Sequence, residues 1–265
     1  MNKTELLNKL AGDREERLLL ARLMDLLEAA QQKNIPACSG FLSPHEAEAA
    51  SRLIAACGHP RHLFFGGYEG AERRVCLFLP DWMEDGLSFF DDEGPITALR
   101  ATFYPGDHLT HRDFLGALMG MGVTRESVGD LLVDEGRCDM LVLREVAGFL
   151  AQSMESAGRT KIRLAPLSLA ELQPPLPQVK LIRDTVAALR LDAVLAAGFS
   201  VSRSRAAEYI SAGRAAVNWQ ECLKPDRTVA QGDVLSCRGL GKCLVKEVGG
   251  QSRKGRILLT LERYV

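Results

Sequence analysis

The sequence predicts an α+β protein with a helical N-terminal segment, a middle domain of interleaved strands and helices, and a basic C-terminal unit. Three observations lead to this prediction. Leucine clusters alternate with charged residues at helical spacing near the N-terminus. Short apolar runs bounded by turn residues follow them. A proline-rich stretch then separates an acidic part of the chain from a basic part. The predicted boundaries are 1–60, 61–165, a linker over 166–179, and 180–265.

The net charge of −1 conceals a strong asymmetry between the two ends of the chain. Residues 180–265 contain 15 Lys and Arg against 8 Asp and Glu, a net charge of +7, whereas residues 1–179 carry a net charge of −8. A basic unit of this kind is the electrostatic footprint of a nucleic-acid binder. A solvated charged face is the alternative for either half taken alone.

Cysteine usage and hydropathy favour a reducing, cytoplasmic setting. The seven cysteines are odd in number and form no C-x-x-C pair, which favours reduced thiols over a disulfide framework or a zinc site. The five histidines show no metal-ligand spacing. The N-terminus lacks the apolar core of a signal peptide, and no apolar run reaches the roughly 18 residues of a membrane span. We therefore expect a cytoplasmic protein with no metal and no cofactor.

The N-terminal segment carries two helix signals. An amphipathic leucine pattern covers 17–30. Ser43, Pro44 and Glu46 then supply an N-cap, a proline at the first helical position and a capping box for a helix that ends near Cys57. A small packing domain is the expected role of this segment.

The middle domain alternates strands and helices. We expect strands at 74–79, 96–103, 130–133, 138–143 and 159–164, and helices at 111–121 and 144–156. Strands interleaved with two helices are typical of a ferredoxin-like or RRM-like sheet. The strands from Asp130 onward contain no aromatic residue, so base stacking on them is not predicted.

Two short motifs have simpler explanations than catalysis. His111-Arg112-Asp113 spells the catalytic tripeptide of protein kinases, but the glycine-rich loop, the strand lysine and the D-F-G sequence are missing. We instead expect Asp113 to complete a capping box with Thr110. The segment 238–242 resembles a phosphate loop, but it lacks the required spacing and a following helix.

The clearest linker is 166–177, which ends in Gln-Pro-Pro-Leu-Pro. Prolines stiffen such a segment and prevent a helix. A strand over 180–188 is expected to follow it and to open the basic unit.

The basic unit is organised around the segment 190–219. The segment predicts a helix, a short turn, and a second helix that begins at Ser202 or Ser204 and stops at Gly213. Arg203 and Arg205 lie in its first turn, where the helix dipole disfavours cations. Two arginines beside two hydroxyls and free backbone N–H groups predict an anion-binding site, with a nucleic-acid phosphate as the expected anion.

The order of fixed residues in this unit resembles the S4 RNA-binding domain over about 185–265. The matching residues are Arg190-Leu191-Asp192, Ser202-Arg203-Ser204, Ala206, Ile210, Gly213-Arg214, Val217-Asn218 and Gly232-Asp233. With Asn218-Trp219 and the middle-domain run HRDFLGALMGMGVTRESVGDLLV, most of the chain is similar to the YlmH family of bacterial S4 proteins. This resemblance implies a cytoplasmic protein that binds ribosomal RNA or tRNA on the large ribosomal subunit. It also implies a role in ribosome-associated quality control of stalled peptidyl-tRNA.

We expect a main RNA face and a secondary rim on this unit. The main face comprises Arg190, Arg203, Arg205 and Arg214, with Ser202 and Ser204 as hydroxyl or cap contacts. The rim comprises Lys224, Arg238, Lys242 and Lys254. Arginine suits this role because its planar guanidinium binds phosphates in a bidentate manner and stacks on bases. Asp192 is expected to hold an arginine in place.

No paired carboxylates, Ser/His/Asp set or Cys/His set supports catalysis, so we expect a non-enzymatic protein. Three alternatives remain open. The first is an RNA-modification accessory protein related to pseudouridine synthases. The second is a tRNA synthetase, although no nucleotide-binding signature is present. The third is an assembly or cell-division factor whose acidic N-terminal half binds a protein partner.

Overall fold

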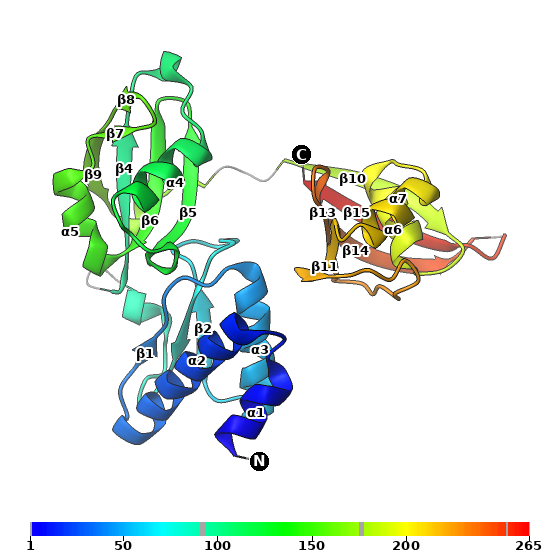
Figure 1. The fold of residues 1–265 in the computed structure, drawn as a ribbon, viewed down its shortest axis with the longest axis horizontal. Helices are drawn as coiled ribbons and strands as arrows, with labels where there is room; N and C mark the ends of the chain where they lie inside the picture. Colours follow the sequence, from blue (N-terminus) through cyan, green and yellow to red (C-terminus); the bar gives the residue numbers. More distant parts are fainter. Residues whose placement is uncertain (1, 91–93, 175–177, 253, 265) are drawn as a thin grey trace. The chain divides into compact units, whose positions relative to one another are not determined.

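The computed structural model describes residues 2–90, 94–174, 178–252 and 254–264 (Figure 1). The chain divides into two compact units, Met1–Pro175 and Leu176–Val265. Both units combine helices with sheets, which confirms the α+β prediction.

The N-terminal part of the first unit packs helices on a three-stranded antiparallel sheet with strand order β1-β3-β2. Its helices and strands are α1 Lys3–Leu10, α2 Arg14–Lys33, β1 Ala37–Cys38, α3 Pro44–Ala56, β2 His62–Phe65 and β3 Val75–Phe78. The predicted capping box of α3 is confirmed. Ser43 Oγ accepts from the Glu46 N–H at 3.3 Å, and Glu46 Oε2 accepts from the Ser43 N–H at 2.6 Å.

Strand β3 corrects the predicted grouping of strands. The sequence pattern groups 74–79 with the middle sheet and predicts helices for 1–60, but β3 is the central strand of the N-terminal sheet. Cys76 and Phe78 pack with the N-terminal helices, while Val75 and Leu77 face a second apolar cluster. Burial on both faces explains why this strand is apolar throughout, without the alternation of a half-exposed strand.

The middle domain is a four-stranded antiparallel sheet in the order β5-β6-β4-β9. Its main elements are β4 Ile96–Thr102, α4 His111–Gly120, β5 Val128–Asp134, β6 Arg137–Leu143, α5 Arg144–Ser153 and β9 Arg163–Leu167. The short elements are η1 Leu87–Phe90, η2 Pro105–Asp107, η3 Arg125–Ser127, β7 Ser156–Ala157, β8 Thr160–Lys161 and η4 Leu169–Glu171. A βαββαβ chain with this strand order is the ferredoxin-like topology, as predicted.

The carboxylate of Asp113 accepts hydrogen bonds from the backbone N–H of Thr110 at 2.8 Å and from its hydroxyl at 2.6 Å. These bonds lower the pKa of Asp113, with the hydroxyl contributing most. The kinase-like tripeptide is therefore the start of a capped helix.

The middle sheet is covered on both faces along part of its length. Helices α4 and α5 pack on one face through a core that includes Leu99, Phe114, Met140 and Leu150. On the other face, a second cluster joins the middle sheet to the N-terminal part of the unit; it contains Phe41, Val75, Leu77, Phe90, Ile96 and Leu141.

The predicted linker begins later than its proline content suggests. Pro166 and Leu167 belong to β9 and lie opposite Leu99 and Ala98. Proline is compatible with this position because β9 is an edge strand. Residues 175–177 of the predicted linker lie outside the described residues.

The second unit packs two helices on a six-stranded sheet in the order β10-β15-β14-β13-β11-β12. Its elements are β10 Val179–Val186, α6 Leu191–Phe199, α7 Arg203–Ser211, β11 Ala215–Val217, β12 Gln220–Glu221, β13 Val234–Cys237, β14 Gly241–Gln251 and β15 Ile257–Tyr264. One core joins helix residues such as Leu195 and Ile210 to sheet residues such as Leu235 and Leu261. Figure 1 shows α6 and α7 lying along this sheet.

Candidate RNA-binding site

Helix α7 presents arginines at its N-terminus because its cap and its core face are fixed by neighbouring residues. Ser202 is the N-cap, and its hydroxyl accepts from the Arg205 N–H at 3.2 Å. Ala206 and Ile210 are buried, which orients the helix and leaves the side chains of Arg203 and Arg205 each 56% exposed. The first turn of α7 therefore faces solvent with two cations.

Asp192 organises two arginines from different places in the chain. Its carboxylate accepts from Arg190 Nε at 3.2 Å and Nη2 at 3.1 Å, and from Arg203 Nε at 3.1 Å. The Asp192 side chain is 7% exposed, whereas those of Arg190 and Arg203 are 42% and 56% exposed. One buried carboxylate thus holds two exposed guanidiniums, and the group keeps a net positive charge.

The ionisation of Asp192 follows from these contacts. Burial alone would raise its pKa, but the hydrogen bonds and charges of Arg190 and Arg203 outweigh burial, so the pKa lies below its usual value. The same pairing with Asp192 raises the pKa of Arg190. The predicted role of Asp192, holding an arginine in place, is confirmed and extends to two arginines.

A second arginine pair meets at an aromatic ring that the sequence analysis did not single out. The guanidinium carbons of Arg205 and Arg214 lie 4.8 and 4.4 Å from the centroid of Tyr209. Arg214 Nη2 also donates to the Arg238 carbonyl oxygen at 2.7 Å, and Arg205 pairs with Glu208 at 2.8 Å. The spacing of Arg205 and Tyr209, one helical turn apart, is the sequence signal for this stack.

The predicted rim does not form one surface. Lys242 lies at the start of β14, with its ammonium 4.4 Å from the ring of Tyr264, whereas Lys254 lies in the loop beyond the end of that strand. At the rise of an extended strand, the two ends of β14 are about 30 Å apart. Lys224 is exposed in the segment between β12 and β13. The exposed Arg238 adjoins the main face, because its carbonyl oxygen accepts from Arg214.

The turn Asn218-Trp219 is strained. Both residues have a left-handed backbone, with φ of 50° and 61°, a region that favours glycine. Asn218 fixes the turn because its amide donates to Asp233 Oδ1 at 2.8 Å and its side-chain oxygen accepts from the Val234 N–H at 2.9 Å. Trp219 remains 37% exposed. The sheet therefore holds a partly exposed indole at the tip of the β11–β12 hairpin.

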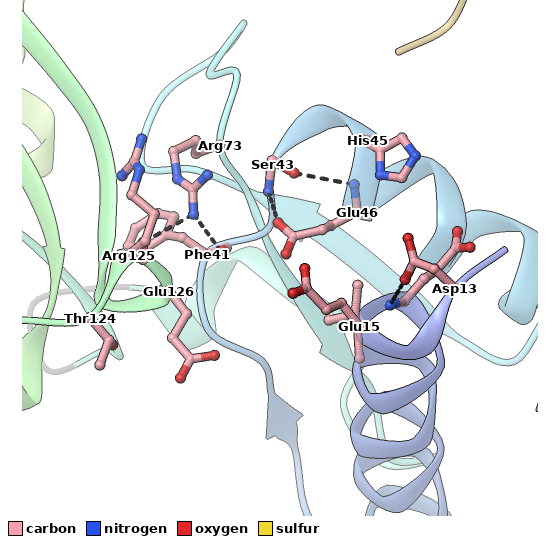
Figure 2. Close-up of a pocket in the computed structure, with 12 residues that line it drawn as sticks. Asp13, Glu15, Phe41, Ser43, His45, Glu46, Arg73, Thr124, Arg125 and Glu126 are labelled. Atoms are coloured by element: carbon pink, nitrogen blue, oxygen red, sulfur yellow. Dashed lines mark hydrogen bonds between the residues drawn. The ribbon is translucent and has the colours of Figure 1, made fainter. Parts of the chain in front are cut away.

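The first unit contains a cavity of about 530 Å³ with a different character (Figure 2). Its charged lining comprises Asp13, Glu15, Glu16, Glu46, Glu126, Arg73 and Arg125, with His45 beside them. Carboxylates outnumber guanidiniums five to two, which disfavours a phosphate ligand. We therefore assign no RNA contact to this cavity.

Arg73 in this cavity connects the two parts of the first unit. Its guanidinium donates to the carbonyl oxygens of Phe41 at 2.8 Å, Val128 at 2.9 Å and Arg125 at 3.0 Å. Burial, with a smaller effect from Arg125, lowers the pKa of Arg73 to about 10. Arg73 remains cationic at neutral pH and joins the N-terminal part of the unit to the middle domain.

Within the described part of the chain, no group of three or more His, Cys, Asp or Glu side chains is arranged to hold a metal ion. No helix among the described residues combines the length and apolarity needed to cross a bilayer. The seven cysteines are free thiols, and five of them are buried.

Comparison with known proteins finds two family domains in the chain. Residues 102–171 match the family model described as "Putative RNA-binding domain in YlmH", and residues 189–235 match the S4 domain. The chain is 30% identical to "Ribosome-associated protein quality control protein P2" of Bacillus subtilis over 250 residues, which cover 94% of this chain and 96% of that protein. The chain belongs to the YlmH family.

A solved structure shares the fold of part of the chain. The "Cell division protein ylmH from Streptococcus pneumoniae" aligns with a TM-score of 0.50 at 22% identity, covering 61% of this chain and 96% of that chain. At this identity the likeness concerns the fold alone. In the present YlmH family member, the S4 match begins just before Arg190 and includes Arg203, Arg205, Tyr209 and Arg214.

Proposed function

We propose that this protein binds structured RNA, ribosomal RNA or tRNA, on the large ribosomal subunit through the exposed arginines at the N-terminal ends of α6 and α7. The observation that carries the proposal is the carboxylate of Asp192, which orients Arg190 and Arg203 toward solvent. Guanidiniums that are already oriented lose less conformational entropy when a phosphate binds.

The arginines around Tyr209 extend this face. Arg205 and Arg214 stack on the ring of Tyr209, and Arg238 lies beside Arg214. The ring attracts both guanidiniums without neutralising them, so they can contact phosphates or bases. Lys224, Lys242 and Lys254 contribute mainly to the overall positive charge of the unit.

At the level of process, we propose a cytoplasmic, non-enzymatic role in ribosome-associated quality control of stalled peptidyl-tRNA. Support comes from the YlmH family membership and from the name of the Bacillus subtilis relative, which aligns over nearly the full length of both proteins. The alternative of an assembly or cell-division factor acting through a protein partner of the acidic half makes a different prediction. Under that alternative, the complexes of this protein with its partners would survive RNase treatment.

The test is sedimentation of lysate through sucrose gradients at moderate and high salt. We expect the protein to travel with the large ribosomal subunit, and Arg203→Ala plus Arg205→Ala to move to the top of the gradient. A matched control, Lys180→Ala plus Arg183→Ala, removes two exposed cations of the same unit from strand β10. This control should remain bound.

The salt dependence of RNA affinity, measured with purified protein and RNA, reports on the same arginine–phosphate interactions. Removing one arginine–phosphate interaction should reduce the slope of log K against log salt by about 0.7 to 0.9. Wild-type protein that stays at the top of the gradient at every salt concentration would overturn the ribosomal proposal. Equal losses of binding in the double variant and in the Lys180/Arg183 control would overturn the assignment of the face.

A further inference from the structure

The face of the middle sheet that is opposite α4 and α5 changes character along its strands. Cross-strand partners define three rows on this face: Ala98 with Leu141, Arg100 with Asp139, and Thr102 with Arg137. The first row is covered, because Leu141 is fully buried in the cluster shared with the N-terminal part. The backbone also closes over it, since a Cβ built on Gly67 would lie 2.1 Å from Leu141 Cδ2. No RNA can reach this end.

The second row is occupied by an ion pair between its own two side chains. Arg100 Nε and Nη2 donate to the two carboxylate oxygens of Asp139 at 2.6 and 2.7 Å. The Asp139 side chain is 3% exposed and that of Arg100 is 27% exposed, so the carboxylate is buried and both of its oxygens are used by one guanidinium. It offers no free charge to a ligand.

The third row is open and cationic. Thr102 of β4 lies between Arg137 of β6 and Arg163 of β9. Arg137 shares its guanidinium with Asp134 at 3.0 Å and Gln173 at 3.2 Å. Arg163 and the nearby Lys161 are exposed, and within the described part of the chain neither has a carboxylate within 4.0 Å. Two cations are thus available at this edge.

An aromatic ring lies at the same edge. Tyr104, two residues past the end of β4, is 74% exposed. Its ring packs on the backbone of η2, where a Cβ built on Gly106 would lie 2.6 Å from Tyr104 Cε1. Tyr104, Lys161 and Arg163 line one depression of about 550 Å³, together with Glu155. The ring is supported by backbone and has solvent over most of its surface.

We propose that this edge of the middle domain binds an unpaired nucleotide of RNA, with the base stacked on Tyr104 and the neighbouring phosphates on Arg163 and Lys161. Aromatic side chains flanked by cations bind single-stranded RNA in this way, because every base has a stacking face and every linkage a phosphate. Glu155 disfavours a second phosphate on its side of the depression. The inference rests on the proposed function for the ligand class and adds a contact that is separate from the S4 unit.

The experiment compares two fluorescent RNAs that share one blunt-ended duplex, of which only one carries a six-nucleotide 3′ tail. Full-length protein is titrated with each RNA. We expect Tyr104→Ala to weaken binding of the tailed RNA about tenfold and to leave binding of the blunt duplex within twofold. Tyr104→Phe should retain the affinity, since it keeps the ring. Phe149→Ala, which removes a half-exposed aromatic of α5 in the same domain, should change neither RNA.

A second readout locates the contact directly. A 5-iodouridine in the tail should crosslink to Tyr104 under long-wavelength ultraviolet light, as identified by mass spectrometry of the digested complex. A crosslink confined to the S4 unit would overturn the inference.

The two proposals fail in distinguishable ways. Arg203→Ala plus Arg205→Ala should weaken both RNAs, since it acts through the S4 face. If that double variant loses binding while Tyr104→Ala changes nothing, the inference is wrong and the proposed function stands. If Tyr104→Ala weakens both RNAs equally, the edge does not recognise unpaired nucleotides and the inference is wrong. If wild-type protein binds neither RNA and no ribosomal subunit, both proposals fail.

Discussion

Two regions of this protein pair arginine with a buried aspartate and use the pair differently. In the first unit, Arg100 meets Asp139 with side-chain exposures of 27% and 3%. In the second unit, Asp192 accepts from both Arg190 and Arg203, which are 42% and 56% exposed. The chemistry is the same, but the number of arginines per carboxylate and their exposure differ.

The difference separates an ion pair that stabilises the fold from a charged group that holds arginines at the surface. A one-to-one pair with a buried carboxylate is neutral and joins two strands, and removal of its arginine leaves a buried charge behind. A two-to-one group at the surface keeps a positive charge and holds it in a fixed orientation. The comparison predicts that substitutions around Asp139 affect folding and that substitutions around Asp192 affect RNA binding.

The largest expected effect comes from Arg100→Ala. It leaves the Asp139 carboxylate buried without a cation, so we expect the free energy of unfolding of the first unit to fall by about 3 kcal/mol. Arg190→Ala should lower that of the second unit by much less, because Arg190 is exposed and Arg203 still pairs with Asp192.

Denaturant unfolding followed by tryptophan fluorescence measures both losses of stability. The chain has two tryptophans, one in each unit. A Trp219→Phe background leaves Trp82 to report on the first unit, and a Trp82→Phe background leaves Trp219 to report on the second. As a control, Arg100→Met with Asp139→Leu should be near neutral, since it removes both charges. Equal losses for Arg100→Ala and Arg190→Ala would contradict the distinction.

The second prediction concerns Asp192→Asn and RNA affinity. The substitution removes a negative charge, which by electrostatics alone would strengthen RNA binding. We expect binding to become about five times weaker instead, because Arg190 and Arg203 lose the partner that orients them and must be ordered on binding. Fluorescence anisotropy with the blunt-ended duplex RNA shows whether the substitution weakens or strengthens binding. Tighter binding would mean that Asp192 only repels the ligand.

A smaller effect is expected in acid. The folded pKa of Asp192 is lowered below its unfolded value near 3.9. Its stabilising contribution is therefore present above the unfolded pKa and is lost as pH falls through the folded pKa. Between about pH 5 and pH 3, the melting temperature of the second unit should fall further in the wild-type protein than in Asp192→Asn. Parallel declines, read from Trp219 fluorescence in the Trp82→Phe background, would contradict this assignment.

The smallest effect is expected at Glu208. Its pair with Arg205 is exposed on both sides, at 63% and 56%. Such pairs contribute little, so Glu208→Ala should change the free energy of unfolding by less than about 0.5 kcal/mol. RNA affinity should stay within twofold, because Arg205 remains stacked on Tyr209. A large loss in either measurement would show that this surface pair also orients the arginine.

Much of the fold could be predicted because its signals are local. The capping boxes at Ser43 and Thr110 and the N-cap at Ser202 each join residues within four positions of one another. The βαββαβ order was predictable from strand and helix periodicity. The assignment of 74–79 was not, because only partners from both parts of the unit show that β3 belongs to the N-terminal sheet.

The candidate sites were predictable in part. The cations at the start of α7 follow from the Ser-Arg-Ser sequence, and the sequence already predicts that Asp192 holds one arginine. The separation of Lys242 from Lys254 depends on the length and pairing of the β14–β15 hairpin. Tyr104 was missed because it lies past the end of a strand, and its neighbours Lys161 and Arg163 come from two strands almost sixty residues later.

The sequence by itself determined the charge asymmetry, the helix caps and the order of elements, since these depend on composition and on hydrogen bonds between near neighbours. Only the tertiary structure decided which charges are free. It placed two arginines on Asp192 and one on Asp139, and it covered one end of the middle sheet while leaving Tyr104 open. The physical reason is that burial and pairing are properties of residues brought together across long sequence separations, which local patterns do not encode.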